Sequence, residues 1–149
     1  AQVTQEAYDN GDYIFVAMDR HDEGDTFHPE TKLFPPHNIA GTSGRELYGK
    51  LAGVYDAIKD DNRVFWMDKR HYSAFSGTDL DIRLRERRVT TVVLTGVLTD
   101  ICVLHTAIDA YNLGYDIEVV ASATASLTPE AHDFAIGHFK NVLGATIVE

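Results

Sequence analysis

One cysteine is the clearest candidate for covalent chemistry in this sequence. Cys102 follows an apolar run at residues 91–94 and a short turn, and a helical pattern begins near Asp100. The sulfur is therefore expected in the first turn of a helix, where unpaired backbone N–H groups and the helix dipole favour a thiolate. The carboxyl end of a parallel strand is also where open α/β folds bind ligands. A lone cysteine is usually a small buried hydrophobe, so both interpretations stay open at this point.

A second group of residues has the composition of a metal site. Asp19 and His21 alternate just beyond the first apolar run, so in an extended chain both side chains point to one face. Glu30 and His37 follow, and His28 is a further candidate ligand. Carboxylates and imidazoles together suit zinc, iron or manganese. The alternative is a polar loop whose histidines form local hydrogen bonds.

Lys69 is a third candidate, because it directly follows the apolar run at residues 64–67 and Asp68. A lysine at the end of this strand would lie over the same sheet edge as Cys102, and a neighbouring ammonium lowers the pKa of a thiol. The ordinary alternative is a solvated lysine. Aromatic side chains flank these groups, and each of them is also a candidate for the core: Phe34, Trp66, Tyr72 and Phe75.

Strands and helices that must position these residues alternate along the chain. The short β-rich runs are residues 13–18, 64–67, 91–94, 117–120 and 145–148, and the helical patterns are residues 45–59, 79–87, 100–113 and 129–143. Such alternation predicts an α/β fold, with a doubly wound, mainly parallel sheet and helices on both faces. The stretch from Asp19 to Thr42 has no clear period, and a loop of this length is usually functional.

Length and composition limit the remaining possibilities. A chain of 149 residues is the size of a single domain, and its formal net charge of −10 would repel a nucleic acid. No apolar run is long enough for a transmembrane helix. The single cysteine excludes an internal disulfide, so we expect a reduced, cytoplasmic setting. The sequence leaves open whether the chain forms a homo-oligomer.

Four segments of the chain, taken in order, carry a family resemblance. They are Asp19-Arg-His21, Phe34-Pro-Pro-His37, residues 69–79 and residues 96–103. Together they resemble the metal-binding, catalytic-lysine and nucleophile motifs of the nicotinamidase/pyrazinamidase family of isochorismatase-like cysteine hydrolases. All four in this order are much more specific than any one alone. Isochorismatases and carbamoyl-amidases share the lysine and cysteine segments, but they lack this metal motif.

The resemblance implies an isochorismatase-like hydrolase fold and an amidase reaction. The expected substrate is nicotinamide, which is converted to nicotinic acid and ammonia through a thioester, and pyrazinamide is a further expected substrate. Cys102 is expected to be the nucleophile and Lys69 its catalytic partner. Backbone N–H groups of Leu98 and Cys102 are expected to stabilise the oxyanion, next to a cis peptide between Val97 and Leu98.

The resemblance also implies a cofactor and a substrate pocket. We expect one divalent metal ion, zinc before iron or manganese, that binds the ring nitrogen of nicotinamide and orders water. Its expected ligands are Asp19, His21, Glu30 and His37. The ring is expected to lie against Phe34, Tyr72 and Phe75.

One part of the family pattern has no counterpart in the chain. The family's triad contains an aspartate at the end of a first strand, which is central in the sheet. Residues 1–10 look like the end of a helix that leads into the strand at Tyr13, and no aspartate occupies that place. We therefore expect a further strand and this aspartate upstream of Ala1, and no direct pairing between the strands at Tyr13 and Thr91. Two alternatives remain open, a different isochorismatase-like amidase and a non-catalytic domain with this fold.

Overall fold

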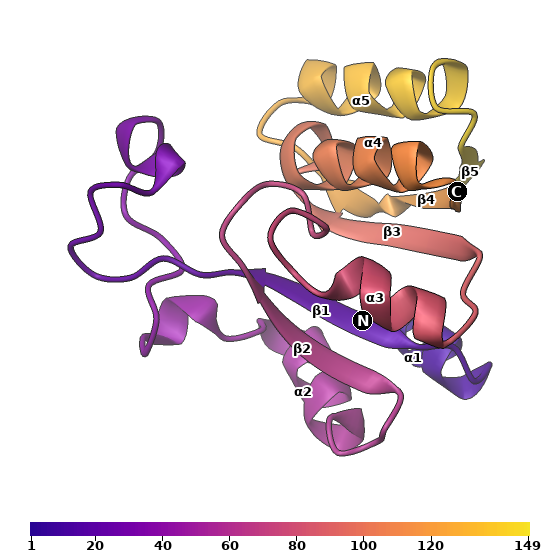
Figure 1. The fold of residues 1–149 in the computed structure, drawn as a ribbon, viewed down its shortest axis with the longest axis horizontal. Coiled ribbons are helices and arrows are strands. Elements are labelled where there is room, and N and C mark those ends of the chain that lie inside the picture. The colour runs from indigo at the N-terminus through magenta and orange to yellow at the C-terminus, as the bar shows by residue number, and fades with distance from the viewer. The chain divides into compact units, whose positions relative to one another are not determined.

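The computed structural model describes residues 1–149, which divide into two compact units, Ala1–Arg70 and His71–Glu149. Each unit contains parallel strands and the helices that connect them, as Figure 1 shows. The predicted α/β fold class with a parallel strand arrangement is therefore confirmed. The prediction of a single domain stays a prediction. No helix has both the length and the apolar character that a bilayer span requires.

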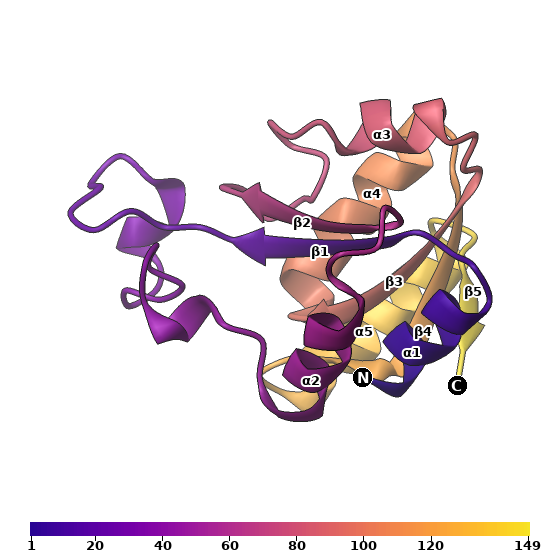
Figure 2. The ribbon, with the colours of Figure 1, turned by 90° about the horizontal axis from the view of Figure 1, so that it is seen from below.

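The first unit is built on two parallel strands. Its elements are α1 (Gln2–Asp9), β1 (Ile14–Asp19), η1 (Pro29–Lys32), η2 (Ser43–Arg45), α2 (Gly49–Ile58) and β2 (Val64–Lys69). The register pairs Ile14 with Val64 at one end and Asp19 with Lys69 at the other. Both α-helices lie on the same face of this strand pair (Figure 2). The last residues of β1 and β2, which the sequence singled out for chemistry, therefore lie side by side.

The loop between β1 and α2 extends beyond the end of β1 (Figure 1) and is mostly irregular, as expected. It folds back on itself at an isolated parallel bridge between His21 and Ile39. There the His21 N–H donates to the Asn38 carbonyl at 3.1 Å, and the Ala40 N–H donates to the His21 carbonyl at 2.8 Å. These bonds fix the backbone on both sides of the predicted ligands.

The predicted helix of residues 45–59 is wrong at its start, because α2 begins at Gly49. Residues before it form the short 3-10 helix η2, and then Glu46 and Tyr48 adopt extended backbone angles. Gly49 itself has φ +59°, which lies in the left-handed region. A right-handed helix cannot continue back through such a residue, so α2 starts there.

The second unit contains the other three strands, in the order β3-β4-β5 and all parallel. Its elements are α3 (Leu80–Glu86), β3 (Thr91–Val97), η3 (Thr99–Val103), α4 (Leu104–Leu113), β4 (Asp116–Ala125), α5 (Pro129–Asn141) and β5 (Thr146–Val148). Helices α4 and α5 cover one face of these strands (Figure 1). The core between them includes Ala107, Val119 and Phe139, which are fully buried.

Each unit has its own parallel strand pairing. β1 pairs with β2 in one sheet, and β3 pairs with β4 in the other. The strands at Tyr13 and Thr91 belong to different units, so the expectation that they do not pair directly stays a prediction.

Helix α5 begins and ends as its sequence indicates. The Thr128 side chain accepts a hydrogen bond from the Ala131 N–H at 3.2 Å, and Pro129 occupies the first helical position. Both features are favourable at a helix N-terminus. Gly144 follows the helix with φ +65°, a conformation that glycine adopts without steric cost.

Tyr115, which directly precedes β4, ties that strand to α3. Its hydroxyl donates to Asp81 Oδ1 at 2.6 Å, and the residue is only 5% exposed. Burial, followed by the hydrogen bond to the Asp81 carboxylate, raises the pKa of Tyr115 to about 12 from an ordinary value of 10.0. The folded protein therefore holds this proton more tightly than the unfolded chain does.

A dependence of stability on alkaline pH follows from this pKa. The contribution of Tyr115 is complete below about pH 10 and is lost as the pH rises towards about 12. Tyr115→Phe cannot titrate, so we expect wild type to lose on the order of 2 kcal/mol more than the variant between these limits. Urea unfolding of both proteins at pH 9 and pH 12 measures the difference. Equal losses would show that Tyr115 is not involved.

Candidate active site

The ends of β1 and β2 bring an aspartate and a lysine together. Asp19 and Lys69 are direct neighbours in the strand register, and Lys69 Nζ donates a hydrogen bond to Asp19 Oδ1. Lys69 is only 5% exposed, so it is not a solvated surface lysine. A buried ammonium is tolerated when a carboxylate compensates its charge. Asp19 was expected to be a metal ligand. In the structure its Oδ1 accepts the hydrogen bond from Lys69.

Two of the predicted metal ligands converge on a third in the loop beyond β1. Glu30 Oε2 lies 3.6 Å from His21 Nε2 and 3.4 Å from His37 Nε2. The rings of His21 and His37 are 4.3 Å apart between centroids. Glu30 is 5% exposed and His21 is 9% exposed, so this carboxylate is not a solvated surface group. The turn η1 places Glu30 here, because its carbonyl accepts backbone bonds from Leu33 and Phe34.

His28 belongs to the same cluster. Its ring centroid is 4.2 Å from that of His21, and candidate ligand atoms of His21, His28 and Glu30 all lie within 4.8 Å of one another. His28 Nδ1 also accepts a hydrogen bond from the Glu30 N–H at 3.2 Å, which caps η1. His28 therefore fits both interpretations from the sequence. It forms a local hydrogen bond, and it lies close to the other candidate ligands.

The donor set of this cluster fits a divalent metal ion. Both ring nitrogens of His21 are buried and have no hydrogen-bond partner in the protein. Burial lowers the pKa of His21, and the neighbouring His37 and His28 lower it further, so its imidazole is neutral and keeps a free lone pair. An unpartnered buried polar atom costs stability unless a ligand satisfies it. A cation bound by His21, Glu30 and His37 would supply that partner.

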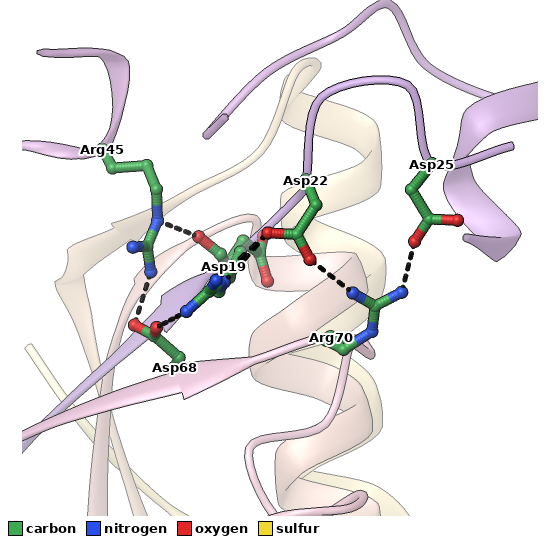
Figure 3. Close-up of polar contacts among 7 residues, drawn as sticks. Asp19, Asp22, Asp25, Arg45, Asp68 and Arg70 are labelled. Carbon is green, nitrogen blue, oxygen red and sulfur yellow. Dashed lines mark hydrogen bonds and ion pairs between the residues drawn. The ribbon is translucent and has the colours of Figure 1, made fainter. Parts of the chain in front are cut away.

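Arg45 holds the end of β1 in a way that the sequence analysis did not foresee. Figure 3 shows its guanidinium between the backbone of Asp19 and the side chain of Asp68. Nε donates to the Asp19 carbonyl at 2.9 Å, and Nη2 donates to Asp68 Oδ1 at 2.6 Å. Burial by itself would raise the pKa of Asp68, but hydrogen bonds from Arg45, Trp66 and Arg20 outweigh it and leave that pKa lowered.

Arg70 was also not foreseen, and it ties the loop to the residue after Lys69. Figure 3 shows its guanidinium between Asp22 and Asp25. Nη1 donates to Asp22 Oδ2 at 3.1 Å, and Nη2 donates to Asp25 Oδ2 at 2.5 Å. The hydrogen bond from Arg70 lowers the pKa of Asp25, so this ion pair is present at neutral pH. The partners are about 45 residues apart in sequence, and nothing in their local pattern indicates the pairing.

Cys102 lies where the sequence predicts it, in the first helical turn after β3. It belongs to η3, a π-helical turn that continues into α4, and its thiol is half-buried and forms no disulfide. The peptide between Val97 and Leu98 is cis, as the family resemblance implies. The Leu98 carbonyl accepts the N–H groups of Ile101 and Val103 at 3.1 Å and 3.2 Å, which closes the turn around Cys102.

Side chains from other elements of the second unit support this turn, and the sequence gave no sign of them. Thr99 is fully buried, and its hydroxyl lies 3.0 Å from His132 Nδ1 in α5. Ser126 Oγ donates to Asp100 Oδ1 at 2.6 Å. The Thr106 hydroxyl donates to the Cys102 carbonyl at 2.7 Å. The backbone that carries Leu98 and Cys102 is therefore held from several directions.

The aromatic residues expected around the substrate have different surroundings. Phe34 lies beside the cluster, with its ring 6.2 Å from that of His37 in an edge-on arrangement. Tyr72 packs against His105 at 5.1 Å, and Phe75 stacks on Tyr115 at 5.8 Å, both within the second unit. Phe75 thus has a packing role of its own, and contact of these three residues with substrate stays a prediction.

Parallel strands joined by helices, with a cysteine in the turn after one strand and a lysine at the end of another, define a class of hydrolase. Residues 2–148 match the family model of the isochorismatase domain. The chain belongs to the isochorismatase family.

Within this family, the chain is similar in sequence and structure to proteins that carry the names PncA, pyrazinamidase and nicotinamidase. The isochorismatase family protein PncA of Bacillus subtilis is 54% identical over 147 residues, which make up 99% of this chain and 80% of that protein. A crystal structure of pyrazinamidase/nicotinamidase from Streptococcus mutans has a TM-score of 0.97 at 80% identity, over 99% of this chain and 81% of that chain. The resemblance to nicotinamidases inferred from four short segments is therefore confirmed.

A more distant structure bears on the metal. The pyrazinamidase of Pyrococcus horikoshii, solved in complex with zinc, has a TM-score of 0.84 at 27% identity, over 99% of this chain and 81% of that chain.

Proposed function

We propose that this protein is a metal-dependent cysteine amidohydrolase that converts nicotinamide to nicotinic acid and ammonia, and that it also cuts pyrazinamide. The observation that carries the proposal is the cluster of His21, Glu30 and His37, in which His21 and Glu30 are buried, in the same unit as the Asp19–Lys69 pair. The family resemblance links such a metal motif to nicotinamidases rather than to metal-free relatives. The names of the similar proteins support the same substrates.

Cys102 is the proposed nucleophile. Its sulfur attacks the carboxamide carbon, an S–C bond forms, the C–N bond breaks, and the thiol proton leaves with ammonia. Water then adds to the thioester carbon and restores the thiol, which releases nicotinic acid. Backbone N–H groups of Leu98 and Cys102 are the proposed donors to the oxyanion, because preorganised donors stabilise the charge that develops there.

Lys69 is the proposed cationic partner in this chemistry. Its ammonium is buried and already paired with Asp19, so its charge is held in place rather than solvated. A fixed positive charge stabilises a thiolate and lowers the pKa of its thiol. Lysine, with its compact ammonium, suits this role.

One divalent metal ion, zinc in our proposal, would be held by Asp19, His21, Glu30 and His37. When bound, this ion would act as a Lewis acid toward the ring nitrogen of nicotinamide and would order water. His21 and His37 each offer an imidazole Nε2 within 4 Å of Glu30 Oε2, and Glu30 offers a buried carboxylate. Phe34, next to His37, is proposed to lie against the apolar face of the ring.

The test of the proposal is release of ammonia and nicotinic acid by the zinc-loaded protein. We expect turnover of nicotinamide and of pyrazinamide, and none of benzamide above about a hundredth of that rate, because benzamide has no ring nitrogen for the metal. Product chromatography and an ammonia assay measure both products. Equal rates on benzamide and nicotinamide would favour a metal-free amidase. No turnover of any amide would favour a non-catalytic domain.

A further inference from the structure

The cluster around Glu30 contains three histidines, and their hydrogen bonds distinguish them. We infer that His28 is not a ligand of the metal but a positioning residue, whose Nε2–H donates to a water molecule held in the site. The inference rests on the proposed metal-dependent function. It adds a residue to which the family resemblance gave no role.

His37 is arranged as a ligand. Its Nδ1 lies 2.9 Å from the Pro35 carbonyl oxygen. A carbonyl can only accept, so Nδ1 carries a proton, and in the neutral form of the ring Nε2 keeps its lone pair. That lone pair is on the atom 3.4 Å from Glu30 Oε2. A metal-binding histidine commonly donates its other ring N–H to a backbone carbonyl in this way.

His28 has the opposite arrangement. Its Nδ1 accepts the backbone N–H of Glu30 at 3.2 Å, and a backbone N–H can only donate. Nδ1 therefore keeps its lone pair, and the proton of the neutral ring is on Nε2. A protonated Nε2 cannot bind a cation. If the proton moved to Nδ1, the Nδ1–H and the Glu30 N–H would be two donors facing each other, and the hydrogen bond that caps η1 would be lost.

The donor on Nε2 lacks an acceptor within the protein. His28 is 3% exposed, and its Nε2 has no hydrogen-bond partner among the protein atoms. Buried donors are nearly always satisfied, by ordered water where no protein group is available. The ring lies 4.2 Å from that of His21, so an acceptor in the metal site is close at hand. Water completing the shell of the metal is such an acceptor, and His28 would fix its position.

The experiment compares His28→Asn with His37→Asn in the full chain. Asparagine keeps an oxygen that can accept the Glu30 N–H, and it is a favoured helix cap, but it has no group at the position of Nε2. We expect metal-free His28→Asn to unfold at the wild-type temperature. It should bind one Co²⁺, with an unchanged number of nitrogen neighbours by X-ray absorption and a shifted visible spectrum. Its affinity for Zn²⁺ should be roughly 10–100-fold lower, as for other residues that support metal ligands.

The matched control and the other outcomes decide the inference. His37→Asn should lose one nitrogen neighbour of Co²⁺ and weaken Zn²⁺ binding more than His28→Asn does. The same loss of a nitrogen in His28→Asn would make His28 a ligand and overturn the inference, as would wild-type Zn²⁺ affinity together with a wild-type Co²⁺ spectrum. If His28→Asn is unstable without metal, His28→Gln takes its place in the same measurements. A wild type that binds neither ion would instead overturn the metal-dependent function itself.

Discussion

Replacing Cys102 with alanine or serine is expected to lower nicotinamide hydrolysis by roughly 10⁴–10⁶-fold, the range in which loss of a nucleophile falls in other hydrolases. The reason is chemical, because no other thiol exists in the chain to form the thioester. Cys102 is half-buried in a turn whose backbone bonds run from Ile101 and Val103 to the Leu98 carbonyl, and these bonds remain in the variant. Steady-state rates with nicotinamide measure the effect.

The controls for this variant use the single cysteine. Zn²⁺ stoichiometry should stay at the wild-type value, and the free energy of unfolding should fall by only about 1 kcal/mol for the lost apolar contact. Alkylation of wild type with iodoacetamide can modify no thiol other than Cys102, so it should remove activity in proportion to labelling. A cysteine present only for packing would leave substantial turnover in Cys102→Ala, and that result would contradict the proposed mechanism.

The fold was predictable because its signals are local. Alternating apolar runs and helical patterns located every strand and the larger α-helices, and Thr128 and Gly144 marked the limits of α5 correctly. The predicted start of α2 was wrong because a single backbone angle determines it. Gly49 has a positive φ, so the helix begins at Gly49 and not at residue 45. Glycine permits both positive and negative φ, so its presence in the sequence does not state which one is adopted.

The candidate site was only partly predictable, for a related reason. His21, Glu30 and His37 were identified by residue type and spacing, and the loop does bring them together. Residue type left His28 open as a further ligand, because the hydrogen bond that its Nδ1 accepts from the Glu30 N–H is not visible in the sequence. Arg45 and Arg70 act across more than 20 residues of sequence, and no periodic pattern records such pairs.

Glu30 is the residue whose loss should most affect the metal. Its Oε2 lies within 4 Å of the Nε2 atoms of His21 and His37, at 3.6 Å and 3.4 Å, and the residue is 5% exposed. Glu30→Gln keeps the shape of the side chain but removes the one negative charge that faces both imidazoles. We therefore expect Zn²⁺ affinity to fall by more than about 100-fold, since neutral amides are poor zinc ligands.

Loss of the metal should also remove the activity of wild type. We expect a chelator to abolish nicotinamide hydrolysis, and added Zn²⁺ to restore it in wild type but not in Glu30→Gln at equal concentration. Zn²⁺ at 100 times its dissociation constant should also stabilise wild type by about 2.7 kcal/mol, because only the folded chain assembles the site. Calorimetric titration and thermal unfolding with and without Zn²⁺ measure both effects.

Glu23→Gln is the matched control, because it makes the same change at an exposed position of the same loop. It should bind Zn²⁺ and hydrolyse nicotinamide as wild type does, which separates the local role of Glu30 from the general loss of one negative charge. Equal Zn²⁺ affinity in Glu30→Gln and Glu23→Gln would mean that the cluster of His21, Glu30 and His37 is not the metal site. Full activity of the chelated wild type would mean that hydrolysis needs no metal, whatever the cluster binds.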